Sequence, residues 1–290
     1  MFTATAKTHS KSPAAVLKKG THLAGLYAWS LIEGFRRRDS FREVDSFVVF
    51  IGHQRSGHSL VGSLLNAHPE MVIAYELDVL GLVTRGFSRN QIFAMIVRRD
   101  RLFAEAGNIQ GRTGYDFSVP GQWQGRARHF RVLGAKKGPR TTRRLFRDRQ
   151  LLAEFKGKLG PKIKAIHVVR NPYDNIATMA ARLDVSLAAA SQEFFLLCEE
   201  LREVRTMLTP GELYTIRHEG FVQDPARRLA SLCEWLDVEP EAEYVRNSAG
   251  VVFESPRKTR GAADWTPDLV ARVEREMGQF DFLAGYSFVS

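Results

Sequence analysis

The chain has 290 residues, 44% of them apolar, and a formal net charge of +10. It has no repeat and no long low-complexity tract, so it suits one sizeable α/β domain rather than two. The positive charge favours acidic partners. Because no helix-turn-helix, zinc-finger or aromatic-basic strand motif accompanies it, we expect no nucleic acid among them.

The N-terminal arm, residues 1–40, precedes the predicted domain, residues 41–290. Within the arm, apolar residues return at helical spacing from Ala14 to Phe35, and basic residues stand on both sides of them. The apolar run is too short to span a bilayer. Two readings remain open: residues 14–38 form an interfacial helix that docks on anionic lipid, or a helix that packs on the domain's own flank or on a second subunit.

The segment from residue 47 to 69 has the layout of a phosphate-binding loop, in which an apolar strand runs through a Gly/Ser loop into an amphipathic helix. It departs from the nucleotide pattern G-x-x-x-x-G-K-[ST] at the Lys position, which holds His58, while the fixed positive charge lies in the loop as Arg55. We therefore expect an anion here, but not an ATP γ-phosphate with its magnesium. The alternative is a Gly-rich turn that binds nothing.

Further along the chain, a helix is predicted over Leu60–Ala67 and a short strand over Met71–Ala74, which leads to Glu76. A carboxylate just beyond a strand end can project over a site at that edge of a sheet and accept a proton. Otherwise Glu76 is a solvated surface group. From Arg126 to Lys164 basic residues recur every few positions, a pattern that would focus positive potential on a polyanionic ligand or would simply be a solvated face.

A second strand is predicted over Ile163–Val169 and ends at Arg170, with Asn171 as the N-cap of the next helix. A magnesium-dependent nucleotidase usually carries an Asp at such a strand end, so Arg170 indicates a second anion site. Helical spacing places the Thr178 hydroxyl on the side where Arg170 emerges. The alternative is that Arg170 forms a surface ion pair with Asp174.

These segments give the chain a resemblance to sulfotransferases that use 3′-phosphoadenosine 5′-phosphosulfate (PAPS). Residues 52–60 are similar to the family's 5′-phosphosulfate loop, and residues 170–174 with Thr178 resemble its 3′-phosphate motif. Residues 257–261 resemble the basic loop that closes over the same phosphate. The chain differs at His58 and Ala135, where the family usually has Thr and Asp, and at His218, where a Tyr often contacts adenosine.

The resemblance implies a mostly parallel sheet with helices on both faces, PAPS as the donor, 3′-phosphoadenosine 5′-phosphate (PAP) as the product, and no metal. It implies that Glu76 is the general base and that Lys136, or failing that Lys137, lies beside the departing phosphate. The implied catalytic residues are Glu76, Arg55, Lys136 and His58, with His53 or His58 as the next candidate for the base. The implied cofactor-binding residues are Arg55, Ser56, Gly57, His58, Ser59, Arg170, Thr178, His218, Arg257, Lys258 and Arg260.

Other interpretations stay open at this point. The acceptor could be a glycolipid, a saccharide or a small-molecule alcohol, and the oligomeric state is undetermined. A small-molecule kinase with a degenerate loop, or a non-catalytic binder of a bis-phosphorylated nucleotide, is the alternative function. No signal peptide is evident, and Cys198 and Cys233 fit buried reduced thiols, so we expect a cytoplasmic protein, with peripheral contact at the inner membrane face if the arm docks there.

Overall fold

The computed structural model describes residues 13–110 and 114–290, and the side chains of its first helix from Leu23 onward. Five strands form one sheet in the order β2-β3-β1-β4-β5, and every pairing is parallel. The predicted α/β class is therefore confirmed. The strands are β1 (Ser46–Ile51), β2 (Met71–Tyr75), β3 (Val132–Lys136), β4 (Lys162–Val169) and β5 (Leu213–Arg217).

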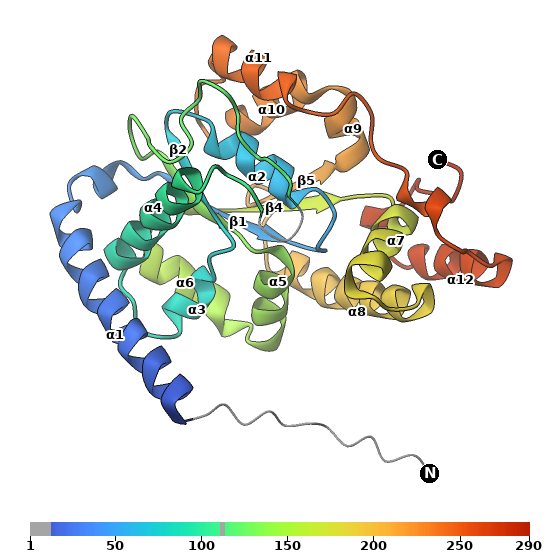
Figure 1. Cartoon of the computed structure of the whole chain (residues 1–290), viewed down its shortest axis with the longest axis horizontal. Helices are drawn as coiled ribbons and strands as arrows, with labels where there is room; N and C mark the ends of the chain where they lie inside the picture. The colour runs from blue at the N-terminus through green and yellow to red at the C-terminus, as the bar shows by residue number, and fades with distance from the viewer. Residues whose placement is uncertain (1–12, 111–113) are drawn as a thin grey trace.

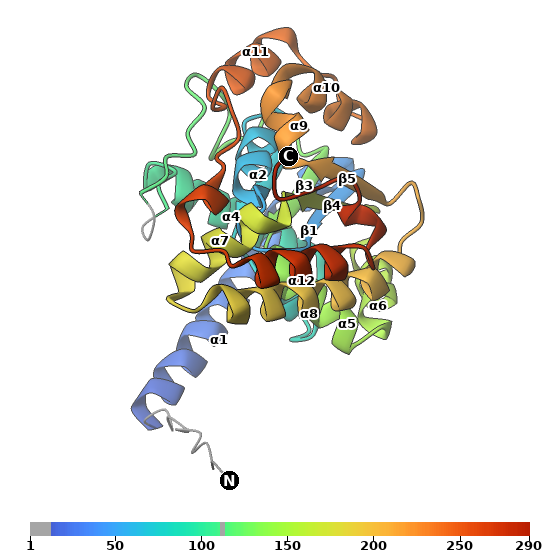
Figure 2. The same cartoon turned by 90° about the vertical axis from the view of Figure 1, so that its right-hand side faces the viewer.

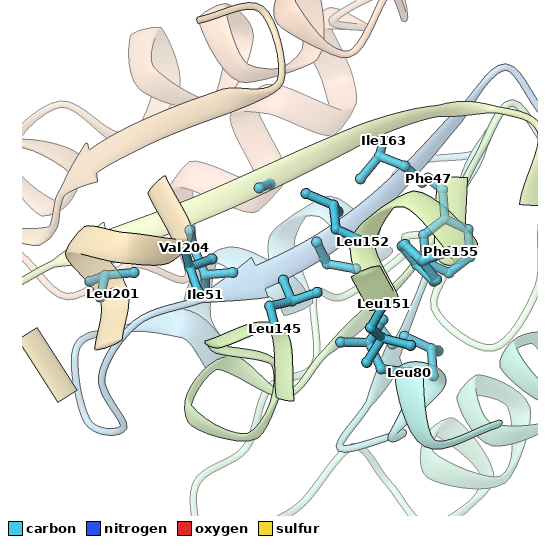
Figure 3. Packing of buried hydrophobic residues seen from close by; sticks show 14 of the residues in the cluster. Phe47, Ile51, Leu80, Leu145, Leu151, Leu152, Phe155, Ile163, Leu201 and Val204 are labelled. Carbon is cyan, nitrogen blue, oxygen red and sulfur yellow. The ribbon is translucent and has the colours of Figure 1, made fainter. Parts of the chain in front are cut away.

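The central strand β1 is buried on both faces, as expected for a parallel strand between two helical layers. Successive side chains of a strand point to opposite faces. Accordingly, Phe47, Val49 and Ile51 join the larger hydrophobic cluster, whereas Val48 and Phe50 join the smaller one. Figure 3 shows the larger cluster, in which Phe47 and Ile51 meet side chains from the helices below the sheet.

Helices cover both faces of the sheet, so the domain has three layers (Figures 1 and 2). The smaller cluster lies under α2 (His58–Asn66), α9 (His218–Gln223), α10 (Pro225–Trp235) and α11 (Ala242–Gly250). The larger cluster lies under α3 (Val79–Val83), α4 (Arg89–Glu105), α5 (Gly138–Arg147), α6 (Gln150–Leu159), α7 (Pro172–Leu183), α8 (Leu187–Thr206) and α12 (Pro267–Met277). Short 3-10 turns are η1 (Ser40–Glu43), η2 (Thr259–Ala262) and η3 (Asp281–Leu283).

The sheet topology opens a crevice beside β1. After β1 the chain enters α2 on one face, whereas after β3 and β4 it enters α5 and α7 on the other face. Loops that leave in opposite directions from neighbouring parallel strands leave space between them at the carboxyl edge of the sheet. The segments that follow β1, β3 and β4 therefore border one site.

Helix α1 (Pro13–Arg36) packs on α4 (Figure 1), and the face that it buries is the less apolar one. The Gln91 side chain donates a 3.2 Å hydrogen bond to the buried Ser30 hydroxyl, and a Cβ on Gly34 would lie 2.8 Å from the main chain of Asn90. The opposite face stays exposed, with Leu31 at 53% and Phe35 at 67%. Helix α1 thus packs on the domain's own flank, but it does so through a different face from the predicted apolar stripe.

None of the helices within the described residues is long and apolar enough to cross a membrane. The side chains of residues 14–22, which belong to the predicted membrane-binding segment, and all of residues 1–12 lie outside the described part of the chain.

Candidate active site

A cavity of about 1560 Å³ lies at the carboxyl edge of the sheet. The segments that follow the strands supply its lining: the loop after β1, Glu76 after β2, Lys137 after β3, Arg170 after β4 and His218 after β5. Residues that are far apart in sequence meet there because all five strands run parallel and end on the same side. The cavity exceeds the roughly 300–1,000 Å³ of a pocket for one small ligand, so it has room for two substrates.

The loop after β1 depends on backbone conformations that favour glycine. Gly52 and Gly57 have φ values of 104° and 108°, and Arg55 adopts φ 66°. A Cβ at Gly57 would also lie 2.6 Å from the Nδ1 of His218. Gly57 therefore allows the loop and the first residue of α9 to approach each other, while the strained Arg55 brings its side chain to the cavity.

His58 begins α2 and is almost fully buried, although its edge lines the cavity. Its Nε2 is 3.0 Å from the carbonyl oxygen of Ile51, which can only accept, so Nε2 carries the proton. Burial, with the nearby Lys136 charge, lowers the pKa of His58 to about 3. The bond to Ile51 uses Nε2, so Nδ1 is the ring nitrogen that could accept a proton, and the lowered pKa makes it a weak base. The catalytic role of His58 therefore stays a prediction.

His53 lies deeper than His58 and does not line the cavity. Its Nε2 is 2.9 Å from the carbonyl oxygen of Phe194, and burial lowers its pKa to about 4. Ser56 is also buried, and its hydroxyl donates to the His53 carbonyl at 2.8 Å. Both residues support the loop from behind. We therefore do not retain His53 as a candidate base or Ser56 as a side-chain ligand.

Glu76, Lys136 and Lys137 form one charged cluster at the ends of β2 and β3. The Glu76 carboxylate forms an ion pair with the buried Lys136 ammonium and another, 3.1 Å long, with Lys137. Burial raises the pKa of Glu76, but the two lysines together lower that pKa by more than burial raises it, so the net shift is downward. The Lys136 ammonium also lies 3.9 Å from the centre of the Tyr75 ring. The cluster thus presents an ionised carboxylate and a fixed cation to the cavity.

Arg170 ties three segments together on the other side of the cavity. Its guanidinium donates to the main-chain carbonyls of Arg55, at 3.2 Å, and Arg257, at 2.7 Å. It also donates to the Thr178 hydroxyl at 3.3 Å, as the helical spacing predicts, and to that of Thr259 at 3.4 Å. The phosphate loop, the motif after β4 and the C-terminal basic loop therefore meet at one guanidinium.

The C-terminal basic loop differs from prediction in which of its side chains reach the cavity. Arg257 lines it, but Arg260 is buried and forms a 3.4 Å ion pair with Asp174, so its charge is neutralised inside the protein. Lys258 is exposed and does not line the cavity. Among the described residues, Asp174 pairs with Arg260, and the alternative of an Arg170–Asp174 surface pair is wrong because Arg170 is buried.

The sequence reasoning missed two lining residues in this region. Thr259 stands between the basic residues of its loop, and its hydroxyl is 3.0 Å from that of Thr178. Phe253 lines the cavity and lies 4.9 Å beneath the Arg257 guanidinium. The sequence contained a signal for both, since Thr259 sits inside the basic motif and Phe253 is an aromatic residue just before it. An exposed aromatic beside a cation suits the stacking of a planar base.

Two buried nitrogen atoms on this side of the cavity have no hydrogen-bond partner among the described residues. They are the Nε of Arg170 and the Nδ1 of His218. Buried polar groups are normally paired, and both residues line the cavity, so a polar ligand that reached these atoms would complete their hydrogen bonds. The residues present therefore fit a phosphorylated nucleotide. The described residues contain no group of three His, Cys, Asp or Glu side chains placed to hold a metal ion.

Comparison with solved structures finds sulfotransferases, and one with a TM-score above 0.5 shares the fold of this chain. The sulfotransferase domain from the curacin biosynthetic pathway is 16% identical, with a TM-score of 0.51 over 81% of this chain and 97% of that domain. Mouse sulfotransferase SULT7A1, solved with PAP, is 14% identical, with a TM-score of 0.46 over 88% of this chain and 90% of its own. A sulfotransferase from Alicyclobacillus acidocaldarius is 16% identical, with a TM-score of 0.43 over 84% and 96%.

No curated protein sequence matches the chain. A model of the sulfotransferase family does match it, over residues 48–242, which include the loop after β1, the Glu76 cluster and Arg170. This match covers more than half of the chain, and it contains the residues that border most of the cavity. The chain therefore belongs to the sulfotransferase family and is a sulfotransferase enzyme.

Proposed function

We propose that the protein transfers a sulfonate group from PAPS to the hydroxyl of an alcohol acceptor, such as a glycolipid, a saccharide or a small-molecule alcohol. The observation that carries the proposal is one cavity with two separate cationic regions. The loop with Arg55 borders one, and Arg170 with Arg257 borders the other. A donor with a phosphosulfate at one end and a 3′-phosphate at the other matches both regions.

When bound, PAPS supplies the sulfonate group and a phosphate leaving group. Arg55, Ser59 and Lys136 would hold the transferring group and stabilise the negative charge that develops on it and on the 5′-phosphate. Lys136 is well placed for this because Glu76 and the Tyr75 ring fix its ammonium group. Arg170, Thr178 and Arg257 would bind the 3′-phosphate and take no part in bond making.

Glu76 would act as the base in this proposal. The acceptor oxygen forms the new bond to sulfur, the bond between sulfur and the 5′-phosphate oxygen breaks, and the hydroxyl proton passes to the Glu76 carboxylate. The net lowering of its pKa keeps that carboxylate ionised and ready to accept. Its side chain is 40% exposed, so an acceptor can reach it.

Calorimetry without magnesium tests the donor assignment. We expect PAP to bind at least tenfold more tightly than adenosine 5′-phosphate or ATP, because PAP is the one of the three that carries a 3′-phosphate for Arg170. Equal affinities would contradict the proposal, and magnesium-dependent ATP hydrolysis would favour the kinase alternative. Tight PAP binding with no transfer from PAPS to any of a broad set of alcohols would favour the non-catalytic binder.

We also propose that the protein is cytoplasmic and contacts the inner face of the membrane through α1. An apolar stripe of Leu23, Tyr27, Leu31 and Phe35 stays exposed on this helix, although the helix packs on α4. The basic segment 36–38 follows it directly. An exposed apolar face beside positive charge suits a surface of anionic lipid. The two cysteines are free and buried, which suits a reducing compartment.

A further inference from the structure

Helix α5 presents a stripe of arginines to the cavity. Arg140, Arg143, Arg144 and Arg147 are spaced i, i+3, i+4 and i+7, so they share one face of the helix, and all four line the cavity. The helix starts directly after β3, which ends at Lys136. The stripe therefore begins next to the Glu76–Lys136 cluster and runs about 10 Å away from it, given a rise of about 1.5 Å per residue.

Acidic side chains pair with three arginines of this stripe but not with Arg147. A single carboxylate, that of Asp78, serves both Arg140 and Arg144, with 2.7 Å to each. Arg143 is matched by Glu193 and Glu200 on α8. Arg147 forms no ion pair or hydrogen bond within the described part of the chain, and Asp148 is the acidic side chain that lines the cavity beside it.

A further arginine lines the same cavity from α7. Arg182 lies in the last turn of α7, is exposed, and has no ion-pair or hydrogen-bond partner among the residues described. The proposed donor does not need this charge, because its phosphosulfate and 3′-phosphate are already assigned to Arg55, Lys136, Arg170 and Arg257. Arg147 and Arg182 thus add positive charge to the cavity lining beyond the residues assigned to the donor.

Helix stability does not explain the stripe. Cations in the last turn of a helix are favourable, which would account for Arg144 and Arg147. Arg140, however, lies in the first turn, where the helix dipole disfavours a cation, and a run that served only solubility would not need to face a cavity. Asp78 compensates Arg140, whereas the helix dipole does not explain why Arg147 and Arg182 line the cavity without a carboxylate partner among the described residues. These two cations indicate that a negatively charged molecule meets this surface.

We propose that the acceptor is an anionic alcohol, which carries carboxylate, sulfate or phosphate groups near the hydroxyl that receives the sulfonate. The α5 stripe and Arg182 bind these groups, and bidentate guanidinium contacts to such oxyanions give both affinity and orientation. This inference rests on the proposed function. It narrows the acceptor to acidic saccharides, acidic glycolipids and phosphorylated alcohols, and it excludes neutral sterol-like alcohols and simple phenols.

The test uses the full chain saturated with PAP, so that the donor region is filled. Calorimetry compares the binding of a neutral and an anionic compound that share a carbon skeleton. The pairs are glucose with glucose 6-phosphate, methyl glucoside with methyl glucuronide, and cellobiose with cellobiouronic acid. At least one anionic partner should bind tenfold or more tightly than its neutral parent. That partner should also be the better acceptor of sulfonate from PAPS.

A double variant, R147E/R182E, separates this region from the sulfonate position beside Arg55. Both arginines are exposed and unpaired in the described structure, so the variant should fold, bind PAP as the parent does, and lose the anionic preference about tenfold. The control R246E/R275E changes the net charge equally at two exposed arginines that do not line the cavity, and it should keep the preference.

Two results would overturn the inference while leaving the donor assignment intact: normal PAP binding with no preference for any anionic partner, or a preference that R147E/R182E retains as fully as the control. Failure of the parent protein to bind PAP would instead contradict the proposed function.

Discussion

The guanidinium of Arg170 donates a 2.7 Å hydrogen bond to the main-chain carbonyl of Arg257, 87 residues further along the chain. The contact joins the motif after β4 to the C-terminal basic loop. It leaves the Arg257 side chain free to reach the cavity, where it meets the Tyr115 hydroxyl at 3.0 Å. One side chain therefore both supports the C-terminal loop and, in our proposal, binds the 3′-phosphate.

Arg170→Ala should weaken PAP binding roughly ten- to hundredfold, because a hydrogen bond to a charged group contributes about 1.5–3 kcal/mol. Arg257→Ala should act in the same direction without disturbing the buried network. Calorimetry measures both, and thermal unfolding shows whether Arg170→Ala still folds. Arg246→Ala, an exposed arginine away from the cavity, is the control, and parental affinity in both site variants would place the nucleotide elsewhere.

Glu76→Gln should lower turnover by roughly two to four orders of magnitude, because the amide cannot accept the hydroxyl proton. PAP affinity should stay within a small factor, since Glu76 faces the acceptor part of the cavity. Steady-state rates of sulfonate transfer and calorimetry with PAP measure the two effects. Undiminished turnover would assign the base to another group.

The pH dependence of the rate follows from the two lysines beside Glu76. Their charges keep the pKa of Glu76 below its usual 4.5, so the base is ionised at neutral pH and the rate falls only as the pH drops through that lowered value. Lys137→Ala removes one of these charges and should move the acidic limb of the profile to higher pH. A limb that stays in place in Lys137→Ala would show that another group titrates.

A glycine variant beneath the loop after β1, compared with a second glycine variant in open space, tests the packing there. A Cβ at Gly138 would lie 2.5 Å from the His58 ring, which its bond to Ile51 holds in place, so Gly138→Ala should destabilise the fold by about 1–3 kcal/mol. Gly157 in α6 has open space around it, and Gly157→Ala should stabilise the fold by about 0.5–1 kcal/mol. Chemical denaturation measures both, and equal effects of the two would contradict the crowded His58 site.

Phe35→Asp should weaken binding to vesicles of anionic phospholipid, because it places a charge in the exposed apolar face of α1. Leu196→Asp is the matched control, since Leu196 is 63% exposed on α8, compared with 67% for Phe35. Co-sedimentation with anionic and neutral vesicles measures the difference. Absence of vesicle binding by the parent, or equal losses in the two variants, would argue against the membrane proposal. Concentration-dependent dimers that Phe35→Asp abolishes would assign the face to a second copy of the chain.

The strands were predictable from sequence because they are apolar runs with clear ends. Those at 71–74 and 163–169 are confirmed within one residue at each end, the strand expected at the start of segment 47–69 is β1, and Asn171 caps α7 as expected. Strand β5 was not predicted: its run from Leu213 to Arg217 lies at the edge of the sheet and is only partly buried, so the sequence lacks the continuous apolar pattern.

The site was harder to predict where a side chain's direction depends on tertiary contacts. Sequence spacing related Thr178 to Arg170 correctly, because both belong to one strand-helix unit. It could not show that Arg260 turns inward, since that depends on Asp174, 86 residues earlier in the chain. The Glu76–Lys136 ion pair was equally hidden, because it requires the pairing of β2 with β3.

The long separation between Arg170 and Arg257 also has a consequence during synthesis. At about 5–20 residues per second, the ribosome needs roughly 4–17 s to add the 87 residues between them. During that interval β1 to β4 can already pair and β5 is added to them, while the Arg170 cation still lacks the carbonyl that later accepts from it. The nascent chain therefore gains the strands of its sheet before it gains a finished site, and competence to bind the nucleotide should appear only after the C-terminal basic loop has been made.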